Sequence, residues 1–231
     1  MNSGPMLFLG LFASMAVSWA TFILAPQLQL GNLAPAKTVS VSSVPVDYPN
    51  NLPGMARLGA EVYRASGCAY CHTMQVRPAT LGSDLARGWG IRRSVAQDYI
   101  FDQPVLLGTQ RIGPDLANAG MRMDATAMLT RLWDPRILQD DSVMPSYRYL
   151  FDVRRIGRAP SSNALVTPRQ FAAPEGWEII PRTPALALAA WMSNSRQDKY
   201  LFEAPPPAPA AGTNAPGTNA APAGAIHAPA K

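Results

Sequence analysis

Both cysteines of the chain and one of its two histidines lie in a single stretch, Cys68-Ala69-Tyr70-Cys71-His72. This spacing matches C-x-x-C-H, the attachment signature of c-type haem. Two thiols three residues apart on a helical turn can form thioether bonds to the two vinyl groups of one haem, and the adjacent imidazole then reaches the iron as proximal ligand. We therefore expect one haem c, attached covalently to Cys68 and Cys71 and ligated by His72.

Three other interpretations of the cysteine pair are open. A C-x-x-C redox pair needs no histidine and usually follows a strand in a βαβ unit, a context that the sequence lacks. A structural zinc site needs four ligands, and outside the motif the chain offers only His227. A chance occurrence would place the only two cysteines of the chain in this signature by accident. Haem attachment explains the thiols and the histidine together.

The second axial position of the iron is expected to take a methionine, because the expected folded region holds no second histidine. Met144 lies in a loop about 70 residues beyond His72. Pro145 stiffens the backbone directly after it, and irregular loops often carry functional sites. We therefore expect Met144 to be the distal ligand.

Five further methionines are weaker candidates. Met74 follows the proximal histidine too closely to reach the opposite face of the haem. Met128 and Met192 fall inside expected helices, where a role in packing is the better interpretation. Met121 and Met123 precede a helix in a loop and stay as alternatives.

The haem would also need polar partners from the surrounding loops. The free ring N–H of the proximal histidine needs an acceptor, and the Gly113-Pro114 turn could present a backbone carbonyl to it. The two propionates need donors, for which Arg77, Arg111 and Trp89 are candidates, because arginine binds carboxylates through two parallel hydrogen bonds.

Residues 4–25 carry no charge, and at ~1.5 Å per residue they are long enough to span a bilayer core of roughly 30 Å. A cleaved signal peptide is the alternative, but the start of the chain lacks Lys and Arg and the apolar run is too long for one. We expect a single uncleaved transmembrane helix. Lys37 is the first basic residue, so flanking charges alone do not orient it.

Composition divides the rest of the chain into three segments. Only 15% of residues are charged, and the 23 prolines concentrate outside the expected helices. Residues 26–53 are expected to form an extended linker, 54–203 a folded domain, and 204–231 a disordered tail rich in Pro and Ala. The net charge of +5 comes from scattered arginines rather than a dense basic run, which argues against nucleic-acid binding.

The folded domain is expected to be all-α, a cytochrome c-like haem domain with long loops and no convincing strand. Helical spacing of apolar residues over 54–66 predicts a helix that runs into the cysteine pair. A second helix fits 124–133, with Asp124 as its N-cap. A third begins at Thr183-Pro184 and continues to residue 196.

Three motifs in sequence order extend the pattern beyond a generic cytochrome c: GCAYCHTMQVRP, DQPVLLGTQRIGPDLANAG and LWDPRILQDDSVMPSYRYL. Together they resemble subunit II of the cbb3-type cytochrome c oxidases, over the amino-terminal anchor and residues 59–151. The resemblance departs at Arg131, where members commonly have histidine. It implies haem attachment and ligation by the residues Cys68, Cys71, His72 and Met144, with the Pro114 loop supporting the histidine.

The resemblance also implies a function and partners. The chain would be an electron carrier without its own substrate site, in an oxygen-reducing, proton-translocating oxidase. It would take single electrons from a soluble or tethered cytochrome c and pass them towards the haem–copper subunit, beside other cytochrome c subunits and membrane lipid. Because c-type haem is attached outside the cytoplasmic membrane, the haem domain would be periplasmic on a single-pass anchor in the bacterial inner membrane.

Two other classes of function stay open at this point. One is another tethered mono-haem cytochrome, either a stand-alone carrier or the small cytochrome subunit of a nitric oxide reductase. The other is a haem-based sensor, which would have a five-coordinate iron and would not need Met144.

Overall fold

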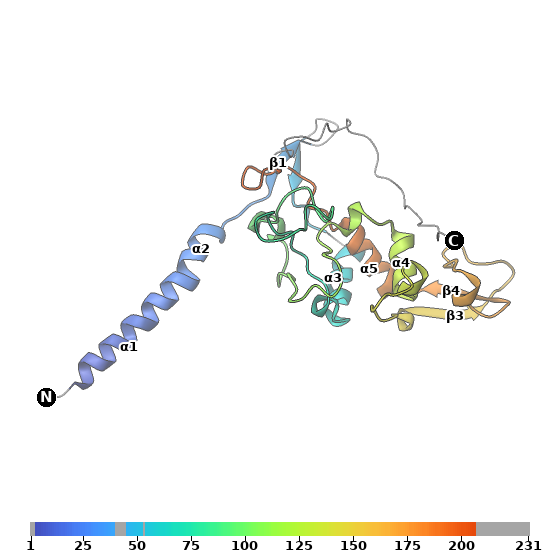
Figure 1. Cartoon of the computed structure of the whole chain (residues 1–231), viewed down its shortest axis with the longest axis horizontal. Coiled ribbons are helices and arrows are strands. Elements are labelled where there is room, and N and C mark those ends of the chain that lie inside the picture. Colours follow the sequence, from blue (N-terminus) through green and yellow to red (C-terminus); the bar gives the residue numbers. More distant parts are fainter. Residues whose placement is uncertain (1–2, 40–44, 53, 207–231) are drawn as a thin grey trace, which may run out of the picture.

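The computed structural model describes residues 3–39, 45–52 and 54–206. Figure 1 shows a long helix that projects from a body of helices and loops, with the β3–β4 hairpin (Phe151–Arg155 and Trp177–Pro181) at the opposite end. The expected disordered tail lies outside the described residues from 207 onward.

The projecting helix consists of α1 (Gly4–Trp19), a π-helical segment (Ala20–Leu24) and α2 (Ala25–Leu30), which follow one another without a break. Pro26 has no N–H, and its ring would clash with the carbonyl four residues earlier, which accounts for the widened π-helical turn before it. The combined helix is 27 residues long and none of it is buried by the rest of the chain. It is apolar and long enough to cross a bilayer, and it ends at Leu30 rather than at the expected Ala25.

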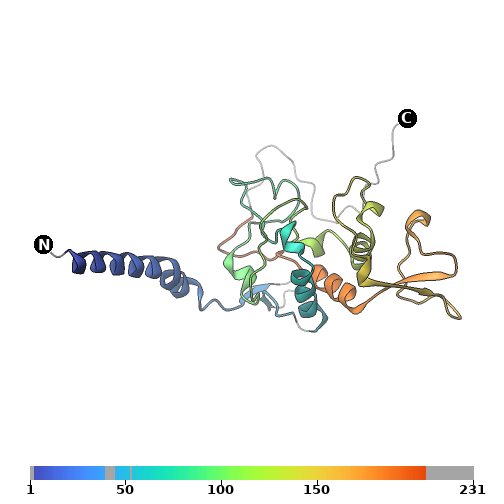
Figure 2. The ribbon, with the colours of Figure 1, turned by 90° about the horizontal axis from the view of Figure 1, so that it is seen from below.

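The segment expected to be an extended linker contains a β-hairpin that contacts the domain. Strand β1 (Ala36–Val39) pairs antiparallel with β2 (Pro45–Tyr48). The hydroxyl of Tyr48 donates a hydrogen bond of 2.6 Å to Oδ1 of Asp98, and the Tyr48 side chain is buried. The hairpin therefore ties the segment that follows the projecting helix to the domain (Figure 2).

Helix α3 (Met55–Ala65) packs against α5 (Thr183–Asn194), and together they form the centre of the domain. A Cβ atom at Gly59 would collide with the backbone of α5, so glycine allows the two helices to approach closely. The rings of Tyr63 and Trp191 meet with centroids 4.7 Å apart. The expected first and third helices are confirmed.

Helix α4 (Ala125–Trp133) packs on α5 and confirms the expected second helix. Oδ1 of Asp124 accepts a hydrogen bond of 2.7 Å from the N–H of Ala127, which makes Asp124 the predicted N-cap. The helix ends at Trp133 with Asp134 as its C-cap, because Pro135 cannot continue the hydrogen-bond pattern. Its buried residues are Met128, Thr130, Leu132 and Trp133.

The expectation of a domain without strands was wrong. Strand β3 pairs antiparallel with β4, with Phe151 opposite Pro181 and Arg155 opposite Trp177. Phe151 and Ile179 are buried in the core, whereas most of β3 is exposed. Helices still dominate the domain, but it is not purely α-helical.

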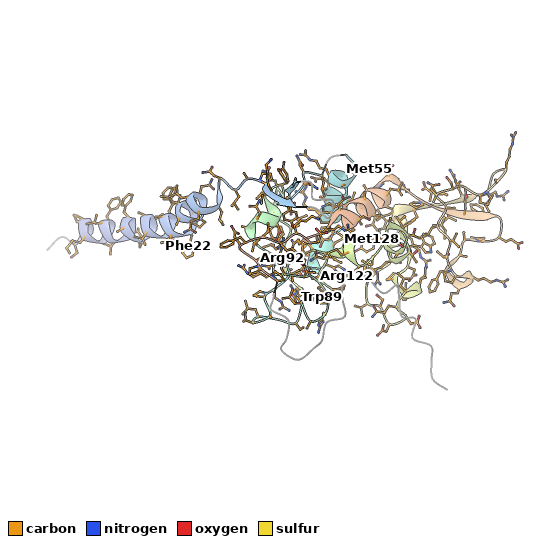
Figure 3. The ribbon with its side chains drawn as sticks, turned by 90° about the horizontal axis from the view of Figure 1, so that it is seen from above. Phe22, Met55, Trp89, Arg92, Arg122 and Met128 are labelled. Carbon is orange, nitrogen blue, oxygen red and sulfur yellow. The ribbon has the colours of Figure 1, made fainter. Side chains whose placement is uncertain are left out.

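Long loops and short 3-10 helices make up most of the remaining domain, as expected. One anchor of these loops is Arg92, which is fully buried and pairs with Asp98 at 2.6 Å. Its Nε donates to the carbonyl oxygen of Lys199 at 2.6 Å, which ties the C-terminal segment back to the domain. Figure 3 shows Arg92 inside the body of the molecule. The 3-10 helices are Cys68–Tyr70, Ala96–Tyr99, Ala119–Met121, Pro135–Ile137, Arg148–Leu150 and Arg169–Phe171.

Candidate functional site

The C-x-x-C-H motif forms a tight turn at the end of α3. Gly67 has φ +72°, a left-handed conformation that favours glycine, and it redirects the chain after the helix. Cys68 begins a 3-10 turn, and the N–H of His72 donates to the Cys68 carbonyl at 3.0 Å. The thiols of Cys68 and Cys71 are free of a disulfide and partly exposed. The turn therefore presents two thiols and an imidazole within five residues.

The His72 ring is held by one hydrogen bond from the opposite loop. Its Nδ1 lies 2.8 Å from the carbonyl oxygen of Pro114, the interaction predicted for this turn. A carbonyl can only accept, so Nδ1 carries the proton and Nε2 keeps a free lone pair. Burial lowers the pKa of His72, outweighing the opposite effect of this hydrogen bond. The imidazole is therefore neutral and has the tautomer that a metal ligand requires.

Two glycines allow the opposite loop to lie directly against His72. A Cβ atom at Gly113 would collide with the imidazole ring. Gly108 has φ +79°, and a Cβ atom there would collide with the His72 carbonyl. The N–H of Gly113 donates to the Cys71 carbonyl at 2.9 Å, which fixes the loop in this position. The close contact depends on the absence of side chains at both positions.

Asp115 fixes the loop that carries Pro114, a role that could not be inferred from the sequence. Its carboxylate is fully buried, and Oδ2 accepts hydrogen bonds of 2.7 Å from the Thr73 hydroxyl and from the N–H of Gln75. Oδ1 accepts from the N–H of Ala117 at 2.9 Å. These bonds join the segment after His72 to the segment after Pro114, so Asp115 positions both partners of the histidine hydrogen bond.

Asp134 holds the two ends of the loop that contains Met144. Its carboxylate accepts hydrogen bonds from Arg136, at 2.8 and 3.0 Å, and from Arg148 at 2.7 Å. The hydrogen bonds from Arg136, with that from Arg148, lower the pKa of Asp134 to about 2, against the opposing effect of burial. The Met144 side chain is partly buried and packs on the hydrophobic core. The loop is therefore closed at its base by a buried carboxylate between two arginines.

Tyr147 links the Met144 loop to the cysteine motif. Its N–H donates to the carbonyl of Leu132 at 2.7 Å, and its hydroxyl interacts with the thiol of Cys68. Burial raises the pKa of Tyr147 to about 12, so the hydroxyl stays protonated. The loop of the expected distal ligand and the first expected attachment cysteine thus lie side by side.

The surroundings of the thiols fit a large apolar group better than a reactive dithiol. Burial raises the pKa of Cys68 to about 11, whereas redox-active cysteines have lowered pKa values. The hydroxyl of Tyr63, whose electrostatic neighbours include Cys68 and Cys71, is buried without a hydrogen-bond partner in the part of the chain that the structure describes. Two free thiols, a neutral imidazole with an available Nε2 and an unpartnered hydroxyl together fit a haem c.

The remaining methionines differ in exposure. Met128 and Met192 are buried in the core with 4% and 7% exposure, which confirms their expected packing role. Met74 is also buried, and the N–H of this residue bonds to the carbonyl of Leu107 at 2.9 Å. Met123 packs on the core, and Met121 is exposed.

Arg77, Arg111 and Trp89, expected near the propionates, come together around a buried carboxylate. Both arginines form ion pairs with Asp84, which is fully buried. Burial alone would raise the pKa of Asp84, but the hydrogen bonds from the two arginines outweigh it and keep the pKa below its ordinary value. The Arg111 guanidinium lies 5.7 Å from the centroid of the Trp89 ring. The role of these residues towards propionates stays a prediction.

A cavity of about 550 Å³ lies apart from these groups. Its walls come from α3, from the segment 98–104 and from residues 48–52, and neither cysteine nor His72 lines it. It is therefore not part of the candidate site.

Comparison with known families identifies the class of protein to which the chain belongs. The family model described as "Cytochrome C oxidase, mono-heme subunit/FixO" matches residues 12–180. The chain belongs to the FixO family. The match confirms the resemblance to subunit II of the cbb3-type oxidases and covers the C-x-x-C-H motif, Pro114 and Met144. Among the curated proteins, none matches the sequence.

As a FixO family member, the chain is a mono-haem subunit of a cytochrome c oxidase complex, with a catalytic subunit as its partner. Its exposed apolar helix, Gly4–Leu30, makes it a membrane-anchored protein. Of the alternatives left open by the sequence, the match favours the oxidase subunit over the small subunit of a nitric oxide reductase.

Proposed function

We propose that the chain carries one haem c on Cys68 and Cys71, with His72 and Met144 as the axial ligands of the iron. The observation that carries this proposal is the hydrogen bond of 2.8 Å from Nδ1 of His72 to the Pro114 carbonyl. His72 directly follows the two free cysteines in the sequence. The hydrogen bond leaves Nε2 as the only ring atom able to bind a metal. When bound, the haem supplies an iron that gains and loses one electron.

The protein groups around the haem would attach it, orient it and exclude water. The two thiols fix the position of the haem, and the Pro114 loop sets the orientation of the imidazole. Asp134 closes the base of the loop that would supply the Met144 sulfur as a ligand. Methionine ligation raises the reduction potential and leaves no open coordination position, which suits electron transfer rather than ligand binding.

The subunit would receive electrons from a soluble or tethered cytochrome c and pass them to the oxygen-reducing haem–copper subunit. The helix Gly4–Leu30 would cross the inner membrane once and place the haem domain in the periplasm. The β1–β2 hairpin, which packs on the domain through Tyr48, would keep the haem close to the membrane surface. Such a position suits delivery of electrons to a partner embedded in the same membrane.

Purification from membranes in mild detergent tests this function. We expect a haem-stained band of this chain to co-elute with a polytopic haem–copper subunit. In the reduced sample the haem c of this chain should be low-spin and should not bind carbon monoxide. Elution as a lone cytochrome would contradict the role in the oxidase, and carbon monoxide binding at this haem would support a sensor instead.

A further inference from the structure

Arg131, in the last turn of α4, is partly buried and lacks an anionic partner. Its Nε atom is fully buried and has no hydrogen-bond partner among residues 3–39, 45–52 and 54–206. Within those ranges no carboxylate forms an ion pair with it. Burial lowers its pKa, as expected for a cation without compensating charge. A donor atom buried without an acceptor destabilises the fold, and on a positively charged side chain the most favourable acceptor is an anion.

Two other arginines in the interior of the domain do have such partners. Arg92 pairs with Asp98 at 2.6 Å, both fully buried. Arg111 pairs with the buried Asp84. The fold therefore neutralises these guanidinium groups with its own carboxylates, and Arg131 departs from that pattern.

Arg131 acts electrostatically on two neighbouring groups, His72 and Arg122. Burial is the largest cause of the lowered pKa of each group, and the charge of Arg131 lowers both pKa values further, whereas the Asp115 carboxylate opposes this effect. That carboxylate pairs with Arg111 at 3.6 Å rather than with Arg131. Arg122 itself donates to two neutral backbone carbonyls, those of Asp115 and Asn118. Figure 3 shows Arg122 in the body of the domain. Both arginines thus contribute positive charge at the imidazole expected to bind the iron.

We propose that Arg131 binds a propionate carboxylate of the haem through Nε and the adjacent Nη atom. This inference rests on the proposed haem c, because propionates are the anions that this cofactor brings next to His72. The edge formed by Nε and Nη matches the two oxygens of a carboxylate, and Nε is the atom left without a partner. Arg131 then compensates negative charge close to the iron.

Replacing Arg131 tests the proposal through the reduction potential. In Arg131→Gln the propionate charge is uncompensated and favours ferric iron. We expect the ratio of ferrous to ferric haem at a fixed ambient potential to fall on the order of tenfold, or about 59 mV for a one-electron couple. Redox titration of the detergent-solubilised complex measures this. Arg57→Gln is the matched control, because it removes the same charge from an exposed position on α3. Equal potentials in the two variants would overturn the proposal.

Arg131→Lys keeps the positive charge but cannot form the paired hydrogen bonds, so it tests the contact if the glutamine variant does not fold. We expect the resonance Raman band of propionate bending to shift in this variant, with covalent haem retained. An unchanged band would overturn the proposal. Haem staining of the wild-type chain distinguishes failure of the proposed function from failure of this inference. Absence of haem would contradict the proposed function. Normal haem, with the potential and the Raman band unaltered in the variants, would contradict only the role of Arg131.

Discussion

Nδ1 of His72 lies 2.8 Å from the carbonyl oxygen of Pro114, across 42 residues of sequence. This hydrogen bond determines the tautomer of the imidazole, because a carbonyl can accept only from a protonated Nδ1. It requires glycine at position 113, where a side chain would collide with the ring. It also requires Asp115, whose buried carboxylate joins the two segments. The ligand geometry is therefore built into the loop packing.

Gly113→Ala should disrupt this packing. The added Cβ would collide with the His72 ring, and we expect the free energy of unfolding to fall by about 1–3 kcal/mol. Thermal unfolding of the full chain in detergent measures the change. Gly157→Ala is the matched control, because nothing lies within 4 Å of a Cβ at that position. Equal unfolding temperatures for the two variants would show that the close approach at residue 113 has no energetic importance.

Met144→Ala should remove the distal ligand. We expect the spectral band of methionine–iron ligation to vanish, carbon monoxide to bind, and the equilibrium constant for reduction to fall at least tenfold, or about 59 mV. The exposed Met121 is the matched comparison. If Met121→Ala produces these changes and Met144→Ala does not, the assignment passes to Met121.

The lowered pKa of Asp134 should make the free energy of unfolding depend on pH. Its pKa is lowered from 3.8 to about 2 in the folded chain, so its stabilising contribution is complete above the unfolded pKa and is lost as the pH falls through about 2. Asp134→Asn should therefore reduce the steepness with which the free energy of unfolding falls between about pH 4 and about pH 2. At neutral pH the variant should be less stable by about 1–3 kcal/mol.

Chemical unfolding over a pH series measures this slope. Asp140→Asn, at an exposed position in the same loop, controls for the loss of one negative charge. The same slope in wild type and Asp134→Asn would contradict the predicted role of the carboxylate.

Local signals were strong enough to predict the helices and much of the site. The N-cap at Asp124 and the proline after Asp134 both act within one helical turn, so the bounds of α4 could be read from the sequence. The C-x-x-C-H motif is also local. The Pro114 carbonyl is a long-range partner, and it was predicted because the chemistry of a ligating histidine demands an acceptor.

Features that depend only on long-range packing were missed. Strands β3 and β4 are five residues each. β3 alternates apolar and polar residues from Phe151 to Arg154, but β4 does not alternate and lies far along the sequence, so no tight turn marks the pair. The ion pairs of Arg77 and Arg111 with Asp84 were not predicted, because no spacing rule links these three residues. Likewise, the buried and unpartnered Nε of Arg131 could not be predicted, because it depends on how α4 packs in the domain near His72.

The mass of the intact purified chain, measured together with alkylation of free thiols, shows whether a haem is attached through Cys68 and Cys71. We expect a mass greater than that of the polypeptide by one haem, no thiol available for alkylation, and loss of the added mass in the double variant Cys68→Ser, Cys71→Ser. A mass equal to that of the polypeptide, with both cysteines alkylated in a chain purified from membranes that assemble c-type cytochromes, would contradict this attachment.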